Sequence, residues 1–257
     1  MNLNYKVEGK GKPLVFIHGL SVNLLYWEFL ATHLQSDFQI IRFDLRGHGA
    51  SELGSDEITI DTYVEDLNKL LEELEISNAD LIGFSLGGAV AQKFTIRYPD
   101  KVDSLVLMSS FYKLDQHSSE IINQFKNKLA IGFDEFYDYI LPLVLCPDVI
   151  EANREELLTL KQMASKATNL DAFIKAVDVS LDFNIENDIS KIDVPTLIMA
   201  GKYDEIFLLE SQKDLQKQIR NSKLIVFDNA RHNILVGKNN EEILDILMEF
   251  NKKEADS

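Results

Sequence analysis

Short apolar runs alternate with amphipathic stretches along most of the chain. Runs rich in Val, Ile, Leu and Phe predict strands at residues 13–19, 38–45, 79–85, 102–110, 194–201 and 222–230. These runs are nearly continuous, which is typical of parallel strands that are buried on both faces. The stretches between them have helical spacing. We therefore predict an α/β fold in which helices cover both faces of a mostly parallel, twisted sheet.

The alternation breaks between the fourth and fifth runs. From about Phe111 to Lys191 the spacing is helical, without a clear strand pattern. We predict that residues 111–191 form an inserted helical cap, and that residues 1–110 and 192–257 form the core domain. Aromatic residues in such a cap more often pack within it than contact a ligand. We nevertheless take Phe111, Phe136 and Tyr139 as candidate pocket residues.

Composition limits the partners that this chain can have. It has 257 residues, with 42 acidic against 26 basic side chains and a formal net charge of −16. Such a charge disfavours binding to nucleic acid or to an anionic membrane surface. The N-terminus lacks a signal-like apolar core and no 18 uncharged apolar residues run together, so we expect a cytoplasmic protein. The sequence does not indicate the oligomeric state.

Ser85 lies between two glycines, each two positions away from it. In Gly83-Phe84-Ser85-Leu86-Gly87, an apolar run passes directly into a helical pattern, and Ser85 lies at the junction. The pattern G-x-S-x-G is typical of a nucleophile elbow, in which a sharp turn presents the serine hydroxyl above a sheet. A glycine-rich turn that only packs a helix on a strand is the alternative. A phosphate-binding loop is disfavoured because neither of its glycine patterns is present.

A serine nucleophile needs a base. In open parallel sheets, ligands bind beyond the carboxyl ends of the strands. His232 follows the last apolar run, and histidine is the usual base because its ordinary pKa lies near neutral pH. His33 and His117 lie in helical or cap segments, whereas His18 and His48 lie on strand-end loops that they could merely support. We predict that His232 is the base.

A carboxylate is needed to orient that base. Asp204 follows the fifth run on a loop that begins near Gly201, whereas Asp115 and Asp228 are less well placed. We therefore predict Asp204 as the acid. The histidines and the single cysteine, Cys146, show no metal-ligand spacing, so we predict no metal and no organic cofactor.

Several motifs together resemble the α/β-hydrolase superfamily. They are "FIHGLSVNLLYW" at residues 16–27, "DLRGHGAS" at 44–51 and "GFSLGG" at 83–88. The order Ser85, Asp204, His232 is also the order of that superfamily. One departure is Arg231, where relatives often have glycine before the base.

The resemblance also implies roles for residues near the serine. It implies that the backbone N–H groups of Leu20 and Leu86 form the oxyanion hole. It places Gly19 at the substrate pocket and Trp27 under the pocket wall.

The predicted function is a carboxylesterase-like serine hydrolase that cleaves small to medium uncharged esters through an acyl-enzyme. A serine in place of an aspartate argues against dehalogenase and epoxide-hydrolase chemistry. A carbon–carbon bond hydrolase, lactonase, thioesterase or cofactor-free perhydrolase would use the same triad. A ligand-sensing or scaffolding protein on this fold remains the alternative from another class.

Overall fold

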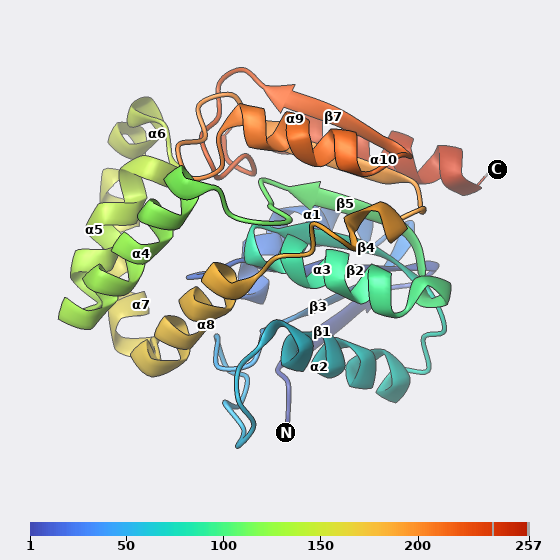
Figure 1. Ribbon diagram of the computed structural model, residues 1–257, viewed down its shortest axis with the longest axis horizontal. Helices are drawn as coiled ribbons and strands as arrows, with labels where there is room; N and C mark the ends of the chain where they lie inside the picture. Colours follow the sequence, from blue (N-terminus) through green and yellow to red (C-terminus); the bar gives the residue numbers. More distant parts are fainter. Residues whose placement is uncertain (238, 256–257) are drawn as a thin grey trace.

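The computed structural model describes residues 1–237 and 239–255. Within these residues, seven strands form one sheet in the order β1-β3-β2-β4-β5-β6-β7 (Figure 1). The strands are β1 (Tyr5–Gly9), β2 (Lys12–Ile17), β3 (Phe38–Phe43), β4 (Ala79–Phe84), β5 (Val102–Met108), β6 (Thr196–Gly201) and β7 (Ser222–Phe227). β1 runs antiparallel to β3, and the other neighbouring strands pair in parallel. The prediction of a mostly parallel α/β sheet is confirmed.

β1 is absent from the sequence prediction for a physical reason. It lies at the edge of the sheet and pairs only with β3. None of its positions is buried, so it shows no continuous apolar run. A strand that is not buried on both faces does not need a continuous run of apolar residues, which is the pattern that predicts the other strands.

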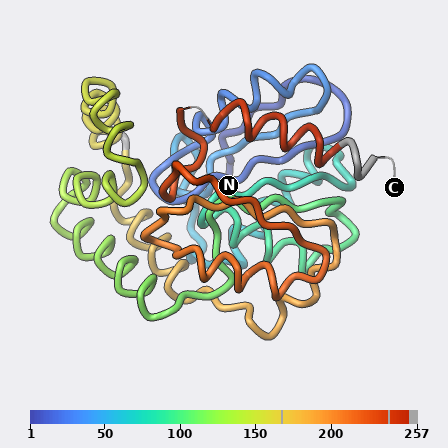
Figure 2. The backbone as a smooth tube through the Cα atoms, turned by 90° about the horizontal axis from the view of Figure 1, so that it is seen from above, coloured from blue at the N-terminus to red at the C-terminus, as the bar shows by residue number. Residues whose placement is uncertain are grey.

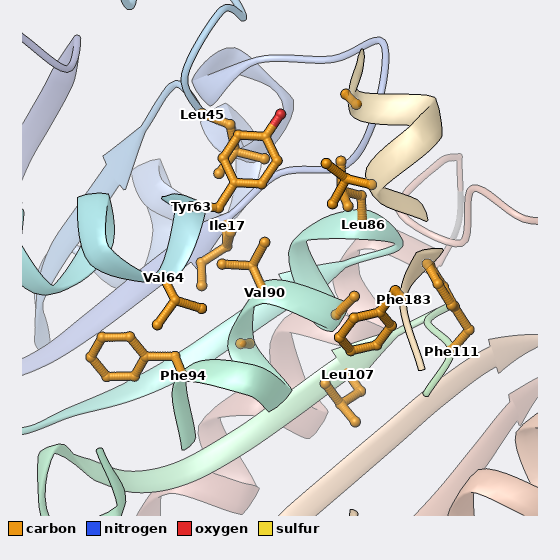
Figure 3. Close-up of a cluster of buried hydrophobic side chains, with 14 of the residues drawn as sticks. Ile17, Leu45, Tyr63, Val64, Leu86, Val90, Phe94, Leu107, Phe111 and Phe183 are labelled. Atoms are coloured by element: carbon orange, nitrogen blue, oxygen red, sulfur yellow. The ribbon is translucent and has the colours of Figure 1, made fainter. Parts of the chain in front are cut away.

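Helices cover both faces of the sheet, as Figure 2 shows from above. α1 (Glu28–Leu34) and α10 (Asn239–Ala255) lie on one face, and α2 (Ile60–Glu73), α3 (Leu86–Arg97) and α9 (Leu209–Gln218) lie on the other. Successive residues of a strand point to opposite faces, so Phe16 packs in the first layer and Ile17 in the second. Figure 3 shows the second layer, where Val90 and Phe94 of α3 lie near Val64 of α2.

The segment between β5 and β6 carries the helices α4 (Gln116–Ile131), α5 (Phe133–Val144), α6 (Pro147–Ala152), α7 (Arg154–Ala167) and α8 (Leu170–Asp182). They stand together beside one end of the sheet (Figure 1). Their sequence range falls within the predicted cap, 111–191, and the division into core and cap remains a prediction. In the part of the chain that the structure describes, no helix is long and apolar enough to cross a membrane.

Candidate active site

Ser85 lies between β4 and α3 in a strained backbone conformation. Its φ is 53° and its ψ is −116°, a region that non-glycine residues rarely adopt. The Ser85 N–H donates to Met108 O at 2.9 Å, and the Ser85 carbonyl accepts a hydrogen bond from Ser110 Oγ, also at 2.9 Å. Strain of this kind persists only where the surroundings hold it, and it is concentrated at functional sites.

The structure brings His232 and Asp204 together. His232 Nδ1 lies 2.9 Å from Asp204 Oδ2, and both side chains are buried. The other oxygen, Asp204 Oδ1, accepts the backbone N–H groups of Ile206 and Phe207 at 2.8 and 3.0 Å. The carboxylate is thus fixed by the backbone on one side and accepts the Nδ1 proton on the other. This leaves Nε2 of His232 free of that proton, as a general base requires.

The alternative acids have other partners. Asp115 Oδ1 accepts the N–H of Ser118 at the start of α4, and its Oδ2 accepts Ser211 Oγ at 3.1 Å. The side chain of Asp228 is 82% exposed and pairs with Lys202. Neither acid contacts His232 in the structure. Among residues 1–237 and 239–255, no group of three His, Cys, Asp or Glu side chains is arranged to hold a metal ion.

Ser85 and His232 line the same cavity, which has a volume of about 460 Å³. Aliphatic and aromatic side chains form most of its wall. The lining residues outside α4–α8 are Leu20, Ser21, Val22, Asn23, Leu25, Tyr26, Phe84, Leu86, Phe111, Ile206, Phe207 and Asn233. Those from the segment that runs from α4 to α8 are Ile122, Phe125, Phe133, Tyr137, Ile140, Leu141, Val144, Leu145, Leu157, Leu160, Ala164 and Ser180. Among the described residues that line the cavity, none is Asp, Glu, Lys or Arg. The cavity suits an apolar, uncharged ligand.

The N–H groups of Leu20 and Leu86 are the ones predicted to form the oxyanion hole, and nearby contacts limit the direction of each. Leu86 is the first residue of α3, so its N–H has no acceptor within the helix and lies at the positive end of the helix dipole. On the other loop, His18 Nδ1 donates to Gly19 O at 2.8 Å while His18 Nε2 accepts Leu45 N–H at 2.9 Å. In a trans peptide the C=O and the next N–H point in opposite directions. The Leu20 N–H is therefore turned away from His18.

A model of the α/β hydrolase fold family matches residues 12–238. This chain belongs to the α/β hydrolase family. A non-heme chloroperoxidase, CPO-A1 from Kitasatospora aureofaciens, is 28% identical to this chain, and the alignment covers 97% of this chain and 95% of the chloroperoxidase. A pimeloyl-[acyl-carrier protein] methyl ester esterase from Aliivibrio salmonicida is 24% identical to this chain, and the alignment covers 95% of this chain and 94% of the esterase.

A solved structure shows the same fold. It is that of MGS-M2, an α/β hydrolase enzyme from a Medee basin deep-sea metagenome library. The TM-score is 0.90 and the sequence identity is 21%, with 97% of this chain and 94% of that chain covered.

The structure places the three aromatic residues predicted for the pocket of this α/β hydrolase differently with respect to the cavity. Phe111 lines the cavity, whereas Phe136 and Tyr139 do not. Both rings meet Phe125 edge-on, at centroid distances of 5.5 and 6.0 Å, and Phe125 itself lines the cavity. Phe136 and Tyr139 thus support the wall from within the helical segment.

Gly19 and Trp27 also lie outside the cavity lining. Trp27 is fully buried and packs against Phe16 and Tyr26, and Tyr26 is the ring that reaches the cavity. A β-carbon at Gly19 would lie 3.1 Å from Ser85 Cβ. Gly19 therefore allows the loop that carries Leu20 to approach the nucleophile.

Several lining residues of this hydrolase were missed by sequence reasoning. Phe84, Phe207 and Asn233 lie within three positions of Ser85, Asp204 or His232, and this proximity was the available signal. Tyr26 OH donates to Asn233 Oδ1 at 2.8 Å, which connects the short helix Leu24–Trp27 to the loop of the base.

Arg231, the departure from the family pattern, joins the helical segment to the base loop. Its Nη1 donates to Pro142 O at 2.6 Å and pairs with Glu205 Oε1 at 2.5 Å. A second hydrogen bond joins the same two segments: the Asn233 N–H donates to Val144 O at 3.0 Å. The end of α5 is therefore fixed beside both His232 and the loop of Asp204.

The stability of this hydrolase should fall in mild acid because two histidines are buried. Burial lowers the pKa of His18 to about 4 and that of His48 to about 3, each from an ordinary value of 6.5. Below about pH 6.5 the unfolded chain binds protons that the folded chain does not, so the free energy of unfolding falls as the pH decreases toward 4. Each proton bound only by the unfolded chain contributes about 1.4 kcal/mol per pH unit to the slope of the free energy of unfolding against pH.

Denaturant unfolding between pH 6.5 and 4.5 measures this effect. His48→Gln should show a smaller slope than the wild type by about 1.4 kcal/mol per pH unit in the lower part of this range. Equal slopes in the two proteins would show that burial does not lower the pKa of His48.

Proposed function

We propose that this α/β hydrolase cleaves uncharged carboxylic esters through an acyl-enzyme at Ser85. The observation that carries the proposal is that Ser85 and His232 line one apolar cavity, and that His232 is bound to the buried Asp204. The methyl ester esterase among the relatives supports ester hydrolysis as the reaction class.

In the proposed mechanism, the Ser85 hydroxyl attacks the ester carbonyl while Nε2 of His232 accepts its proton. The negative charge that develops on the carbonyl oxygen is stabilised by the N–H groups of Leu20 and Leu86. His232 then returns the proton to the leaving alcohol, and the acyl group remains on Ser85. Water, activated by the same histidine, hydrolyses the acyl-enzyme.

The proposed substrates are esters without a charge on the acyl chain. A carboxylate in the cavity would lose its hydration without gaining a cationic partner, because the described lining residues include no Lys or Arg. We expect kcat/KM for p-nitrophenyl hexanoate to exceed that for the mono-p-nitrophenyl ester of adipic acid by at least about 100-fold, since leaving a charge unpaired costs several kcal/mol. The two esters have the same chain length and leaving group.

A thioester comparison separates the proposed esterase from a thioesterase. Hexanoyl-coenzyme A carries a polyanionic leaving group, which the net charge of −16 should repel, the more so at low ionic strength. We expect the aryl ester to have the higher kcat/KM at both low and near-physiological salt. A preference for the thioester at both would overturn the assignment, as would equal rates for the adipic monoester and the hexanoate.

A further inference from the structure

We propose that Ser110 is a positioning residue that holds the Ser85–Leu86 peptide in its catalytic orientation; this inference rests on the proposed function. Ser110 lies just beyond the end of β5, is fully buried, and is not among the residues that line the cavity. Its hydroxyl donates to the carbonyl oxygen of Ser85 at 2.9 Å.

The end of β5 holds Ser85 on both sides. Met108 O accepts the Ser85 N–H, and Ser110 Oγ donates to the Ser85 C=O, so the strained residue is bound through both of its backbone polar groups. Met108 ends β5 and Ser110 lies just beyond it, and β5 is paired with β4 along its length. A left-handed φ on a serine is maintained by such contacts.

The Ser85 carbonyl also determines where the Leu86 N–H points. It accepts Gly88 N–H at 3.0 Å and Ala89 N–H at 3.2 Å, in addition to Ser110 Oγ. The first two donors belong to α3 and move with the helix, whereas Ser110 fixes the carbonyl relative to the sheet. Because a trans peptide is planar, fixing this C=O fixes the Leu86 N–H in the opposite direction.

The surroundings orient the Ser110 hydroxyl itself. Gln92 Nε2 lies 3.4 Å from Ser110 Oγ and also donates to Phe111 O and Gly88 O. The carbonyl oxygen of Ser85 can only accept, so the Ser110 hydroxyl directs its proton there. A β-carbon at Gly88 would overlap Ser110 Oγ, so glycine at this position makes room for the hydroxyl.

The role predicts a loss in the transition state rather than in substrate binding. Ser110→Ala should lower kcat for p-nitrophenyl hexanoate about tenfold, the effect of losing one net hydrogen bond, with KM changed less than twofold. The inhibition constant of an alkyl trifluoromethyl ketone, whose serine adduct bears a charged oxygen, should rise by a similar factor.

Ser109→Ala provides the matched control. Ser109 is the preceding residue, also fully buried and with a positive φ, and its Oγ makes no hydrogen bond within the described residues. This variant should keep the wild-type kcat and inhibition constant. If Ser109→Ala loses as much as Ser110→Ala, or if the loss at Ser110 lies only in KM, the role of Ser110 is structural and the inference is wrong.

Two further measurements separate the role of the Ser110 hydroxyl from the proposed ester hydrolysis. Ser110→Cys retains a weak donor, so it should fall between the wild type and the alanine variant, and full activity in this variant would contradict the inference. The rate at which a fluorophosphonate labels Ser85 should fall about tenfold in Ser110→Ala. If the wild type hydrolyses no ester, the proposed function fails, yet a slower labelling rate would still support Ser110. Unchanged labelling with normal ester turnover would overturn the Ser110 inference alone.

Discussion

Alanine in place of Ser85 should lower kcat for p-nitrophenyl hexanoate by about 10⁶-fold, the size of loss found when the nucleophile of a serine triad is removed. The reason is that the alanine side chain cannot form the acyl-enzyme, while the apolar cavity and the Asp204–His232 pair stay in place. Initial rates of p-nitrophenol release, with the wild type measured in parallel, test this expectation.

The same variant should remain folded. Ser85 makes its structural hydrogen bonds through its backbone N–H and C=O, which alanine retains. We therefore expect the thermal unfolding midpoint to stay close to that of the wild type. Turnover within tenfold of the wild type, in a folded protein, would exclude Ser85 as the nucleophile.

Asparagine in place of Asp204 should lower kcat by about 10⁴-fold. Oδ1 of Asp204 accepts the N–H groups of Ile206 and Phe207, and an asparagine would keep its only oxygen on these donors. Its NH₂ group would then face His232 Nδ1, which must accept, so the ring proton moves to Nε2. In that tautomer Nε2 cannot take the proton of Ser85.

Asp115→Asn is the matched control for this change. Asp115 caps α4 through an oxygen that asparagine also provides, and it does not contact His232. Its kcat should stay within about threefold of the wild type, because side-chain capping is preserved. A large loss at Asp115 with a mild effect at Asp204 would show that the acid is misassigned. The measurement is kcat for both variants at the same pH.

Most of the sheet could be predicted because each of the strands β2 to β7 carries a run of adjacent apolar residues. Each of the strands β2 to β7 overlaps one predicted run, and β2 begins one residue before its run, at Lys12. β1 could not be found in this way because its sequence, YKVEG, has no run of adjacent apolar residues and none of its positions is buried. β7 is also an edge strand, but its Leu-Ile-Val-Phe run made it visible.

Each member of the candidate triad was proposed from its place after a strand: Ser85 directly follows β4, and Asp204 and His232 lie on the loops after β6 and β7. β4, β6 and β7 are parallel, so their carboxyl ends meet at one edge of the sheet, and this topology alone brings Ser85, Asp204 and His232 to the same side. The identity of the acid depended on loop placement, and the structure brings Asp204 to His232.

The direction of individual side chains could not be predicted from composition. Tyr26 and Trp27 are neighbours in one short helix, Leu24–Trp27, yet Tyr26 lines the cavity and Trp27 is buried beneath it. In α7, Leu157 and Leu160 share a face by their spacing, but the spacing does not reveal that this face borders a cavity. Such choices depend on how the helical segment packs over the sheet.

Covalent labelling shows directly whether Ser85 is the nucleophile. The protein is treated with a fluorophosphonate in the presence and absence of p-nitrophenyl hexanoate, and the label is located by peptide mass spectrometry. We predict one label per chain, on Ser85, at a rate that the ester slows by competition. Label on another residue, or labelling that persists unchanged in Ser85→Ala, would contradict the account.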